Sequence, residues 1–343
     1  MEKKIRGNEK ILIVQFKPAG DVLLTTPVAR YLKEKLPDIE VYFLANEQYC
    51  SLLKGNPYIA KVIPIGAAKG KGFKYFRERI SVIKKLRNEK IDVVLDYIGL
   101  PSSAIMAFLS GAKWRAGYRK HRGRNLLYNI KAEHEHSDKY TVLGKYDLLK
   151  PFGIFDDDPL IGTELFIPDD DTGFADDLFN SMGINGCFTV LFSPGSPKLF
   201  KKWPAGCYSD LGKKLIDQYG AKILILYGPS EKGYCEKIRS DIGSDALLLP
   251  ETSLMQAAAV IKKASLCIFN CGGMKHISVA VGTPSVTIFG GTSHINWHPP
   301  GLEWAVFLEG DYADGDSTFG INPGNVIKKI EVLMEKGILR RPA

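Results

Sequence analysis

Short, continuous apolar runs alternate with amphipathic stretches along the whole chain. The first run, KILIVQF at residues 10–16, is typical of a buried strand, and residues 22–36 have the spacing of a helix that ends before Pro37. Buried strands that alternate with helices predict parallel sheets covered on both faces, an α/β fold. The same pattern predicts further strands at 41–45, 59–65, 92–98, 188–194, 222–228, 246–250, 265–270 and 285–291, with helices that include 73–88, 208–220 and 253–264.

The alternation falls into two series, which an acidic, proline-containing stretch at residues 151–170 separates. We therefore expect two Rossmann-like parallel-sheet domains, residues 1–165 and 166–325, that face each other across a cleft. Ligands of open α/β sheets bind at the carboxyl ends of the strands. The functional site should lie in that cleft.

Composition narrows the class of protein. At 343 residues, with 45% hydrophobic and 24% charged residues, the chain can supply a core for each domain. No apolar run approaches the roughly 20 residues of a transmembrane helix, and we expect no signal peptide. The six cysteines form no CxxC pair, which indicates reduced thiols in a cytoplasm rather than disulfides or a zinc site.

Basic residues are concentrated in the first half. The net charge of +8 divides into +10 for residues 1–165, with 29 Lys and Arg against 19 Asp and Glu, and −2 for the rest. A cationic domain suits nucleic acid, a phosphorylated glycan or an anionic membrane. The segment WRAGYRKHRGR at 114–124 is the main candidate, whereas the cations at 84–90 are typical of a solvated helix face. Nucleic acid is disfavoured, because the chain has no nucleic-acid-binding motif.

Asp21 is the first candidate for chemistry. It lies in the loop KPAGDV, directly after the first predicted strand and at the start of a helix. A carboxylate at a helix start is often structural, because free N–H groups and the helix dipole favour it there. The carboxyl end of a first strand also faces the ligand crevice, where a carboxylate can accept a proton from an attacking hydroxyl. Both interpretations remain open at this point.

Residues 193–204, SPGSPKLFKKWP, run from a strand end into a loop of small residues with two lysines. Free N–H groups and a cation, Lys201 or Lys202, suit the phosphates of a nucleotide. The loop is not a Walker A motif, and the first half has no GxGxxG. The alternative is a surface loop with solvated lysines and a packing Trp203.

Residues 269–284, FNCGGMKHISVAVGTP, predict a second anion site. The strand ends at Asn270, two glycines form the turn, and His276 lies in the first turn of the next helix. His276 alone is more typical of a structural histidine. The segment 289–301 adds another glycine turn, so neighbouring strand ends all carry glycine or cations.

Metal and hydrolase chemistry are not expected. His294 and His298 are four residues apart, but the segment between them and the following Pro-Pro predict a loop, and no HExxH or carboxylate cluster accompanies them. The GxSxG motif of a serine hydrolase is missing. We expect no metal and no cofactor.

Taken in order, five segments resemble the signature segments of the ADP-heptose:lipopolysaccharide heptosyltransferase family, glycosyltransferase family 9. The resemblance extends from about residue 10 to residue 300, over segments 11–45, 92–118, 193–204, 253–270 and 272–292. It implies a GT-B glycosyltransferase with an acceptor-binding domain at 1–165 and a donor-binding domain at 166–325, and with residues 326–343 packing back on the N-terminal domain. Members transfer heptose from ADP-heptose to the lipopolysaccharide inner core, inverting the anomeric centre without a metal.

The resemblance also assigns roles. Asp21 matches the family's proposed general base, and Lys201 matches the lysine that contacts donor phosphate. Gly273 and His276 match the family's Asp-[Ser/Thr]-Gly-x-x-His, but Cys271 and Gly272 replace its first two residues. Cysteine is a weak hydrogen-bond partner, and an unpaired sugar hydroxyl costs about 1–3 kcal/mol, enough to change the preferred donor sugar.

The expected catalytic residues are Asp21 and Lys201. The expected donor-binding residues are Ser193, Gly195, Ser196, Lys201, Gly228, Glu231, Cys271, Gly272, Gly273, His276 and Gly290. The expected acceptor-binding residues are Lys74, Arg77, Arg115, Arg119, Arg122 and Arg124.

The implied partners are an ADP-sugar and a phosphorylated glycolipid, with the enzyme cytoplasmic and peripheral on the anionic inner membrane. Two alternatives stay open. One is a transferase-like protein that has lost catalysis and only binds nucleotide or glycan, and the other is a family member that uses a different nucleotide sugar.

Overall fold

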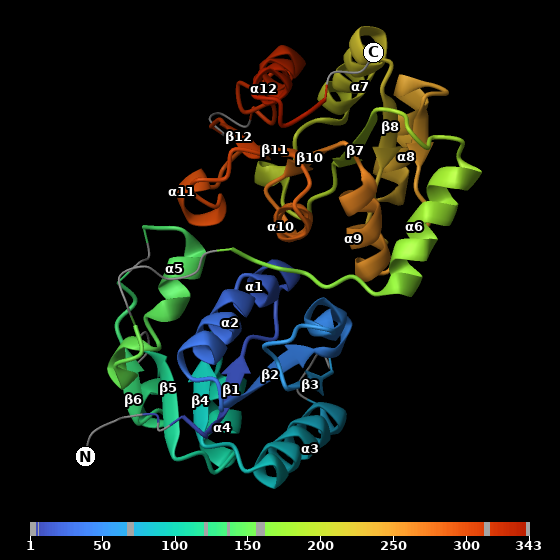
Figure 1. The fold of residues 1–343 in the computed structure, drawn as a ribbon. Coiled ribbons are helices and arrows are strands. Elements are labelled where there is room, and N and C mark those ends of the chain that lie inside the picture. The colour runs from blue at the N-terminus through green and yellow to red at the C-terminus, as the bar shows by residue number, and fades with distance from the viewer. Residues whose placement is uncertain are drawn as a thin grey trace. The chain divides into compact units, whose positions relative to one another are not determined.

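The computed structural model describes residues 5, 7–66, 72–119, 123–135, 138–155, 162–311 and 316–340. The chain divides into two compact units, Met1–Phe166 and Ile167–Ala343. Within the described residues, each unit contains a parallel six-stranded sheet with helices packed on it (Figure 1). The predicted α/β class, with two Rossmann-like parallel sheets, is confirmed.

The first sheet has the strand order β3-β2-β1-β4-β5-β6. Its strands are β1 (Lys10–Val14), β2 (Glu40–Asn46), β3 (Lys61–Ile65), β4 (Val93–Asp96), β5 (Trp114–Tyr118) and β6 (Ile130–Ala132). The order reverses between β1 and β4, which pair in parallel with Val14 opposite Asp96. Ligands bind at such a reversal. Asp21 follows β1 there.

The helices of this unit are α1 (Ala19–Leu23), α2 (Thr26–Lys35), α3 (Phe73–Glu89), α4 (Pro101–Leu109) and α5 (Thr141–Tyr146), with 3₁₀ turns η1 (Glu47–Leu53), η2 (Arg124–Leu126) and η3 (Lys150–Phe152). The single helix predicted for 22–36 is wrong in one respect, because the chain forms α1 and α2 instead. The hydroxyl of Thr25 donates to the carbonyl of Asp21, and that of Thr26 donates to the carbonyl of Leu23. Pro27 has no N–H to continue the first helix.

The second sheet has the order β12-β11-β10-β7-β8-β9. Its strands are β7 (Thr189–Ser193), β8 (Lys222–Ile225), β9 (Ala246–Leu248), β10 (Leu266–Asn270), β11 (Ser285–Phe289) and β12 (Ala305–Glu309). The reversal lies between β7 and β10, which pair in parallel. The lysine-containing loop follows β7, and the glycine turn with His276 follows β10. Both predicted anion sites therefore flank the same position in the sheet.

The helices of the second unit are α6 (Asp169–Ser181), α7 (Ala205–Tyr219), α8 (Lys232–Ile242), α9 (Leu254–Lys263), α10 (Gly273–Val281), α11 (His294–Trp297) and α12 (Pro323–Glu335), with the 3₁₀ turn η4 (Leu199–Lys201). Asn322 begins α12 with a reciprocal capping box to Asn325. Val326, Ile330 and Leu333 of α12 are buried in the core of the second unit. The packing of residues 326–343 on the first domain, which the resemblance implies, stays a prediction.

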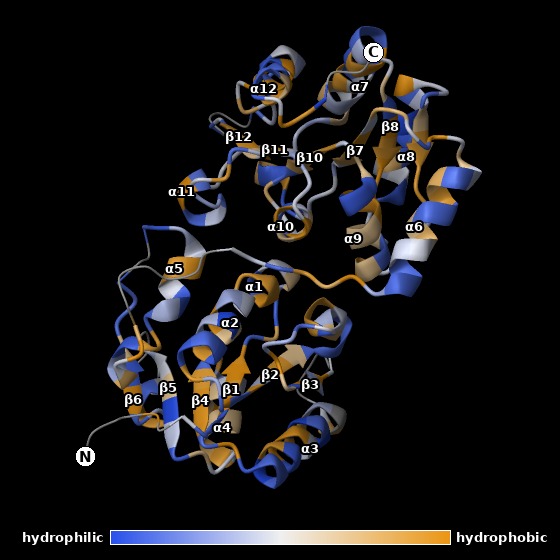
Figure 2. Cartoon of the chain, in the orientation of Figure 1, coloured by the Kyte–Doolittle hydropathy of each residue, from blue (hydrophilic) through white to orange (hydrophobic). Residues whose placement is uncertain are grey.

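Each sheet carries its unit's core. Figure 2 shows β1 and β4 hydrophobic along their length, whereas α3 and α6 mix hydrophobic with hydrophilic residues. This is the distribution of buried parallel strands and amphipathic helices. Among the described helices, none combines the length and the apolar character that crossing a bilayer requires.

Candidate functional site

Asp21 lies in the first turn of α1, just beyond the carboxyl end of β1. Its side chain is 21% exposed, so it is sheltered and still reachable from solvent. Burial raises the pKa of its carboxyl, and the positive charge of Lys145 partly opposes that rise. A carboxylate with a raised pKa is a better proton acceptor than an ordinary surface aspartate.

Lys145 on α5 is the neighbour of Asp21, and the sequence pattern did not single it out. Its Nζ lies 3.9 Å from Oδ1 of Asp21 and 3.5 Å from Oε1 of Gln15, at the end of β1. The ammonium also lies 5.6 Å from the ring centre of Tyr97, the residue after β4. The Tyr97 hydroxyl is buried without a hydrogen-bond partner among the described residues. This end of the first sheet thus combines an acid, a cation and a free hydroxyl.

Asp96, at the end of β4, has a different role. Its Oδ2 accepts a bond of 2.6 Å from the Tyr128 hydroxyl, and its Oδ1 accepts the backbone N–H groups of Ile98 and Gly99. The carboxylate is therefore used within the fold, where it closes the turn after β4. Asp21, by contrast, is partly exposed.

In the second unit, Asn270 connects the carboxyl ends of β7 and β10. Its Nδ2 donates to the carbonyl of Pro194 at 2.8 Å. Its Oδ1 accepts the backbone N–H of Trp203 at 3.1 Å and the hydroxyl of Tyr208 at 3.2 Å. Because these groups are buried, the loop after β7 is held at both ends by one side chain. Trp203 packs in the core of the second unit. A packing role for Trp203 was part of the alternative interpretation of residues 193–204, a surface loop.

The predicted donor residues Gly195 and Glu231 lie against each other. A Cβ at Gly195 would lie 1.9 Å from Oε2 of Glu231, so only glycine fits this position without moving the carboxylate. The same Oε2 accepts the backbone N–H of Gly228 at 2.9 Å. These contacts place the loop that follows Ser193 beside the loop after β8. The Ser196 hydroxyl bonds within its own loop, to the backbone of Lys198.

Gly290, after β11, is a second predicted glycine with a packing reason. A Cβ there would lie 2.5 Å from the Phe319 ring and 2.7 Å from the carbonyl of Phe200. That carbonyl accepts the N–H of Gly291 at 2.9 Å. Since Phe200 precedes Lys201, the turn after β11 supports the loop that carries the lysine.

Lys275 is a buried cation in the first turn of α10. It is 2% exposed, its Nζ donates to the carbonyl of Trp297, and it lies 5.5 Å from the ring centre of Phe289. The pKa of its ammonium is lowered to about 7, mainly by burial; Cys271 opposes the shift, and the charge of Lys201 adds to it. The sequence pattern did not single out Lys275, although it lies beside His276 in the motif.

His276 and His298 are two imidazoles close to these lysines. Burial lowers the pKa of His276 well below its usual value, and the charges of Lys275 and Lys201 add to this. Burial likewise lowers the pKa of His298 to about 4, with Lys275 contributing. His276 Nδ1 is buried without a hydrogen-bond partner in the described part of the chain.

We call Lys201 and Lys275, with the neutral imidazoles of His276 and His298 beside them, the cationic cluster. Its members disfavour one another's protonation, which an anion bound among them would reverse. Gly272 begins α10 with extended backbone and no side-chain cap, so the helix dipole adds to the positive potential. Cys271 is buried next to it. The arrangement suits a phosphate or diphosphate.

The predicted acceptor residues are spread over three elements. Arg77 is exposed on α3. Arg115 on β5 donates to the carbonyls of Leu127 and Ala112, and Arg119 pairs with Glu133 at 2.9 Å. Arg122 and the side chains of Lys74 and Arg124 lie outside the described residues.

The histidines and carboxylates that were considered for metal binding form no further site among the described residues. The described residues contain no group of three or more His, Cys, Asp or Glu able to hold a metal ion. The loop expected around His294 is wrong in part, because His294–Trp297 forms the short helix α11, which the Ser293 hydroxyl caps. There, Nδ1 of His294 lies 2.5 Å from Oε2 of Glu309.

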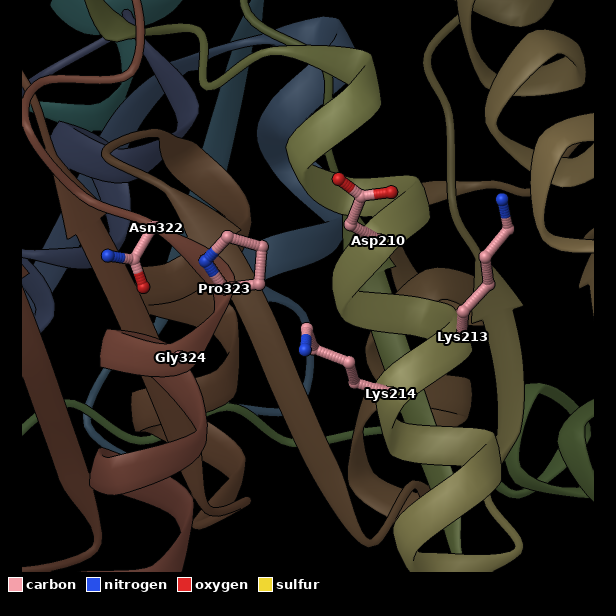
Figure 3. A pocket seen from close by; sticks show the side chains of 6 residues that line it. All are labelled: Asp210, Lys213, Lys214, Asn322, Pro323 and Gly324. Atoms are coloured by element: carbon pink, nitrogen blue, oxygen red, sulfur yellow. The ribbon is translucent and has the colours of Figure 1, made fainter.

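A separate pocket of about 480 Å³ lies between α7 and the start of α12. Figure 3 shows Lys214 reaching into this space and Lys213 pointing away from it. The N–H of Asn325 already bonds to Asn322, so the start of α12 is capped there. The pocket contains none of the predicted site residues. Its lining is Asp210, Lys213, Lys214, Asn322, Pro323 and Gly324.

The sequence is similar to those of known glycosyltransferases. The model of glycosyltransferase family 9 (heptosyltransferase) matches residues 79–313. Lipopolysaccharide heptosyltransferase 3 of Escherichia coli K12 is 27% identical over 316 residues, 85% of this chain and 86% of that protein. Lipopolysaccharide heptosyltransferase 2 of the same strain is 23% identical, over 95% and 98% of the two chains.

Solved structures share the fold. A glycosyl transferase family 9 protein from Veillonella parvula DSM 2008 has a TM-score of 0.86 at 19% identity, covering 98% of this chain and 100% of that one. E. coli heptosyltransferase WaaC with ADP-2-deoxy-2-fluoro heptose has a TM-score of 0.73 at 20% identity, covering 94% and 99%.

Proposed function

Since the chain belongs to glycosyltransferase family 9 (heptosyltransferase) and is a glycosyltransferase, we propose that it transfers heptose, or a closely related sugar, from an ADP-linked donor to the lipopolysaccharide inner core. We further propose that the transfer inverts the anomeric centre and uses neither metal nor cofactor. The observation that carries the proposal is the cationic cluster at the carboxyl ends of β7 and β10, which suits a departing diphosphate.

On the acceptor side, Asp21 acts as the general base. Its carboxylate takes the proton of the acceptor hydroxyl while that oxygen forms a bond to the anomeric carbon. Lys145, 3.9 Å away, keeps the carboxylate ionised and oriented before the proton moves. Because burial raises the pKa of Asp21, the carboxylate accepts the proton more readily than an exposed one would.

On the donor side, the bond from the anomeric carbon to the diphosphate breaks as the new bond forms, and its electron pair leaves with ADP. Lys201, Lys275 and the N–H groups at the start of α10 stabilise the negative charge that develops on the leaving phosphate. Cations in a sheltered site supply the stabilisation that a metal ion gives in other transferases. One displacement from the opposite face inverts the centre.

ADP as the nucleotide is supported by the solved relative E. coli heptosyltransferase WaaC with ADP, whose fold this chain shares. The sugar itself is less constrained. Cys271 stands where the family has an aspartate that is expected to hold sugar hydroxyls, and Gly272 stands where it has Ser or Thr. A sugar that lacks one of those hydroxyls would lose less binding energy here than in a site that carries the aspartate.

The acceptor is a phosphorylated glycolipid of the cytoplasmic membrane leaflet. The charge of +10 in residues 1–165 supports this, because a cationic domain attracts phosphorylated glycans and anionic lipid. We therefore place the enzyme in the cytoplasm, peripheral on the inner membrane.

A donor panel tests the proposal. The full chain is incubated with ADP-heptose, other ADP-sugars and UDP-sugars, each with and without deacylated lipopolysaccharide core. We expect nucleoside diphosphate release that depends on the acceptor and is fastest with an ADP-sugar. If no donor gives acceptor-dependent release while ADP still binds, the protein is a nucleotide- or glycan-binding relative that has lost catalysis.

A further inference from the structure

Two helices of the first unit expose large apolar side chains. Phe73 on α3 is 82% exposed and Phe76 is 56% exposed, and Phe108 on α4 is 49% exposed. Soluble proteins seldom leave several large apolar side chains exposed on adjoining elements unless the surface contacts something. The complete set on these helices is Phe73, Phe76, Ile80, Ile105, Phe108 and Leu109, which we call the α3–α4 face.

Helix geometry gathers these side chains on outward stripes. Residues 73, 76, 80, 84 and 87 follow the three- and four-residue spacing of one side of a helix. Val82 and Leu86, on the other side of α3, are buried in the core of the first unit. The stripe of α3 is therefore apolar in its first two turns and basic, with Lys84 and Arg87, in its later turns.

Contacts join the two helices into one face. α3 packs against α4, and Nε of Arg87 donates to the carbonyl of Leu109 at 2.7 Å. The guanidinium of Arg115 lies 5.4 Å from the ring centre of Phe108. Lys84, Lys85 and Lys113 are exposed. The apolar side chains thus have cations at their border.

The two acidic side chains of α3 each lie beside a cation other than Lys84, Lys85 and Arg87. Glu89 is engaged by Lys61 at 2.5 Å, and Glu78 lies 3.5 Å from its neighbour Arg79. A partner of this face must therefore accommodate apolar side chains and also carry negative charge.

We propose that the α3–α4 face docks the protein on an anionic lipid bilayer. The apolar side chains would enter the boundary between headgroups and acyl chains, while the flanking lysines and arginines contact lipid phosphates. A second copy of this face is a poorer partner, because its cations would meet cations. A nucleic-acid backbone would attract the cations and leave the phenylalanines exposed to water.

The inference deepens the proposed function, since it names the surface that would bring the enzyme to a lipid-anchored acceptor. The docking proposal itself depends only on the exposed apolar side chains and the cations of the α3–α4 face. Enzyme and acceptor confined to one surface meet at a higher effective concentration than in solution. Transfer to a water-soluble acceptor does not require that step.

Vesicle sedimentation of the full chain tests the proposal. Wild-type protein is mixed with phosphatidylglycerol–phosphatidylethanolamine vesicles and with neutral phosphatidylcholine vesicles. Three variants are compared: Phe76→Ser with Ile105→Ser, Lys84→Glu with Lys85→Glu, and the control Val332→Ser, which removes a partly exposed apolar side chain from α12 in the other unit. Transfer to deacylated core acceptor is measured for every protein.

We expect wild type and Val332→Ser to bind anionic vesicles and to bind neutral ones at least tenfold more weakly. Each α3–α4 double variant should lose at least tenfold in vesicle affinity and keep transfer to soluble acceptor within about twofold. Absence of wild-type binding to anionic vesicles, or equal binding by all variants, would overturn the docking surface. Self-association that the double variants abolish would instead identify an interface between copies and also overturn it.

Failure of the proposed function would look different. Wild-type protein would then bind vesicles normally and show no transfer to the soluble acceptor.

Discussion

Lys275 is a lysine that the fold keeps almost entirely from water. Its ammonium is satisfied by one backbone carbonyl and lies near a second cation, Lys201, so its positive charge is poorly stabilised in the free protein. A bound diphosphate would supply the missing negative charge. Binding of ADP and protonation of Lys275 should therefore favour each other.

This coupling predicts a pH dependence of ADP affinity. The pKa of free Lys275 is about 7, so above that pH the amine must take up a proton when the diphosphate binds. ADP affinity should fall as pH rises from 7 to 9, by up to about tenfold per unit, which is the limit for one linked proton. Calorimetry in buffers of different ionisation enthalpy measures both the affinity and the proton uptake.

Two variants isolate the residue responsible. Lys275→Met should bind ADP more weakly at pH 7 and lose most of the pH dependence, whereas Lys201→Met should weaken binding and retain a pH dependence. Cys271, His276 and His298 also face this region, and both histidine pKa values lie below the range used. A wild-type affinity that stays constant from pH 7 to pH 9 would exclude the coupling.

At the residue scale, the sequence could predict which residues follow a strand end, but not which groups contact them in the fold. Asp21, Lys201 and His276 could be selected because each follows a predicted strand end. Lys145 could not, since it comes near Asp21 only through the fold and belongs to no motif. The burial of Lys275 likewise depends on Phe289 and on the carbonyl of Trp297, which local sequence does not specify.

Among the elements, β10 has an organising role through its last residue. Asn270 bonds to the loop after β7, to the residues that lead into α7, and to Tyr208 within α7. The loop that carries Lys201 thus has its two ends fixed to one buried amide. Such a network costs free energy when one member is removed and the others stay buried.

Asn270→Ala should therefore lower the free energy of unfolding by about 3 kcal/mol, because Pro194, Trp203 and Tyr208 each lose a buried partner. Tyr208→Phe removes one of these bonds and should cost about 1 kcal/mol. Urea denaturation followed by tryptophan fluorescence compares the two variants. A loss below 1 kcal/mol for Asn270→Ala would mean that this network contributes little to the loop.

At the element scale, hydrophobic periodicity predicted both parallel sheets and most of their helices. It failed where side-chain bonds decide the local structure. The hydroxyls of Thr25 and Thr26 divide one predicted helix into two, and the Ser293 hydroxyl begins a helical turn where a loop was expected. Strands β5, β6 and β12 were not predicted, and each contains residues that are not buried.

At the scale of the whole molecule, the two units divide the proposed reaction. The first carries the proposed base Asp21 and the basic excess, and the second carries the cationic cluster that we propose binds the diphosphate. The family could be predicted because its segments occur in order along the chain, and the family match confirms it. The roles of individual residues stay predictions, because they depend on bound substrates.

The variant Asp21→Asn is the most direct test of the proposed mechanism. The amide keeps the size of the side chain and cannot accept the acceptor proton, so turnover with the preferred donor should fall at least about a hundredfold while ADP affinity stays within twofold. Asp38→Asn, an exposed aspartate between α2 and β2, is the matched control and should keep full turnover. Acceptor-dependent ADP release and ADP calorimetry are measured on all three proteins. Near-normal turnover by Asp21→Asn would contradict the proposed mechanism, because the Asp21 carboxylate would then not be the base.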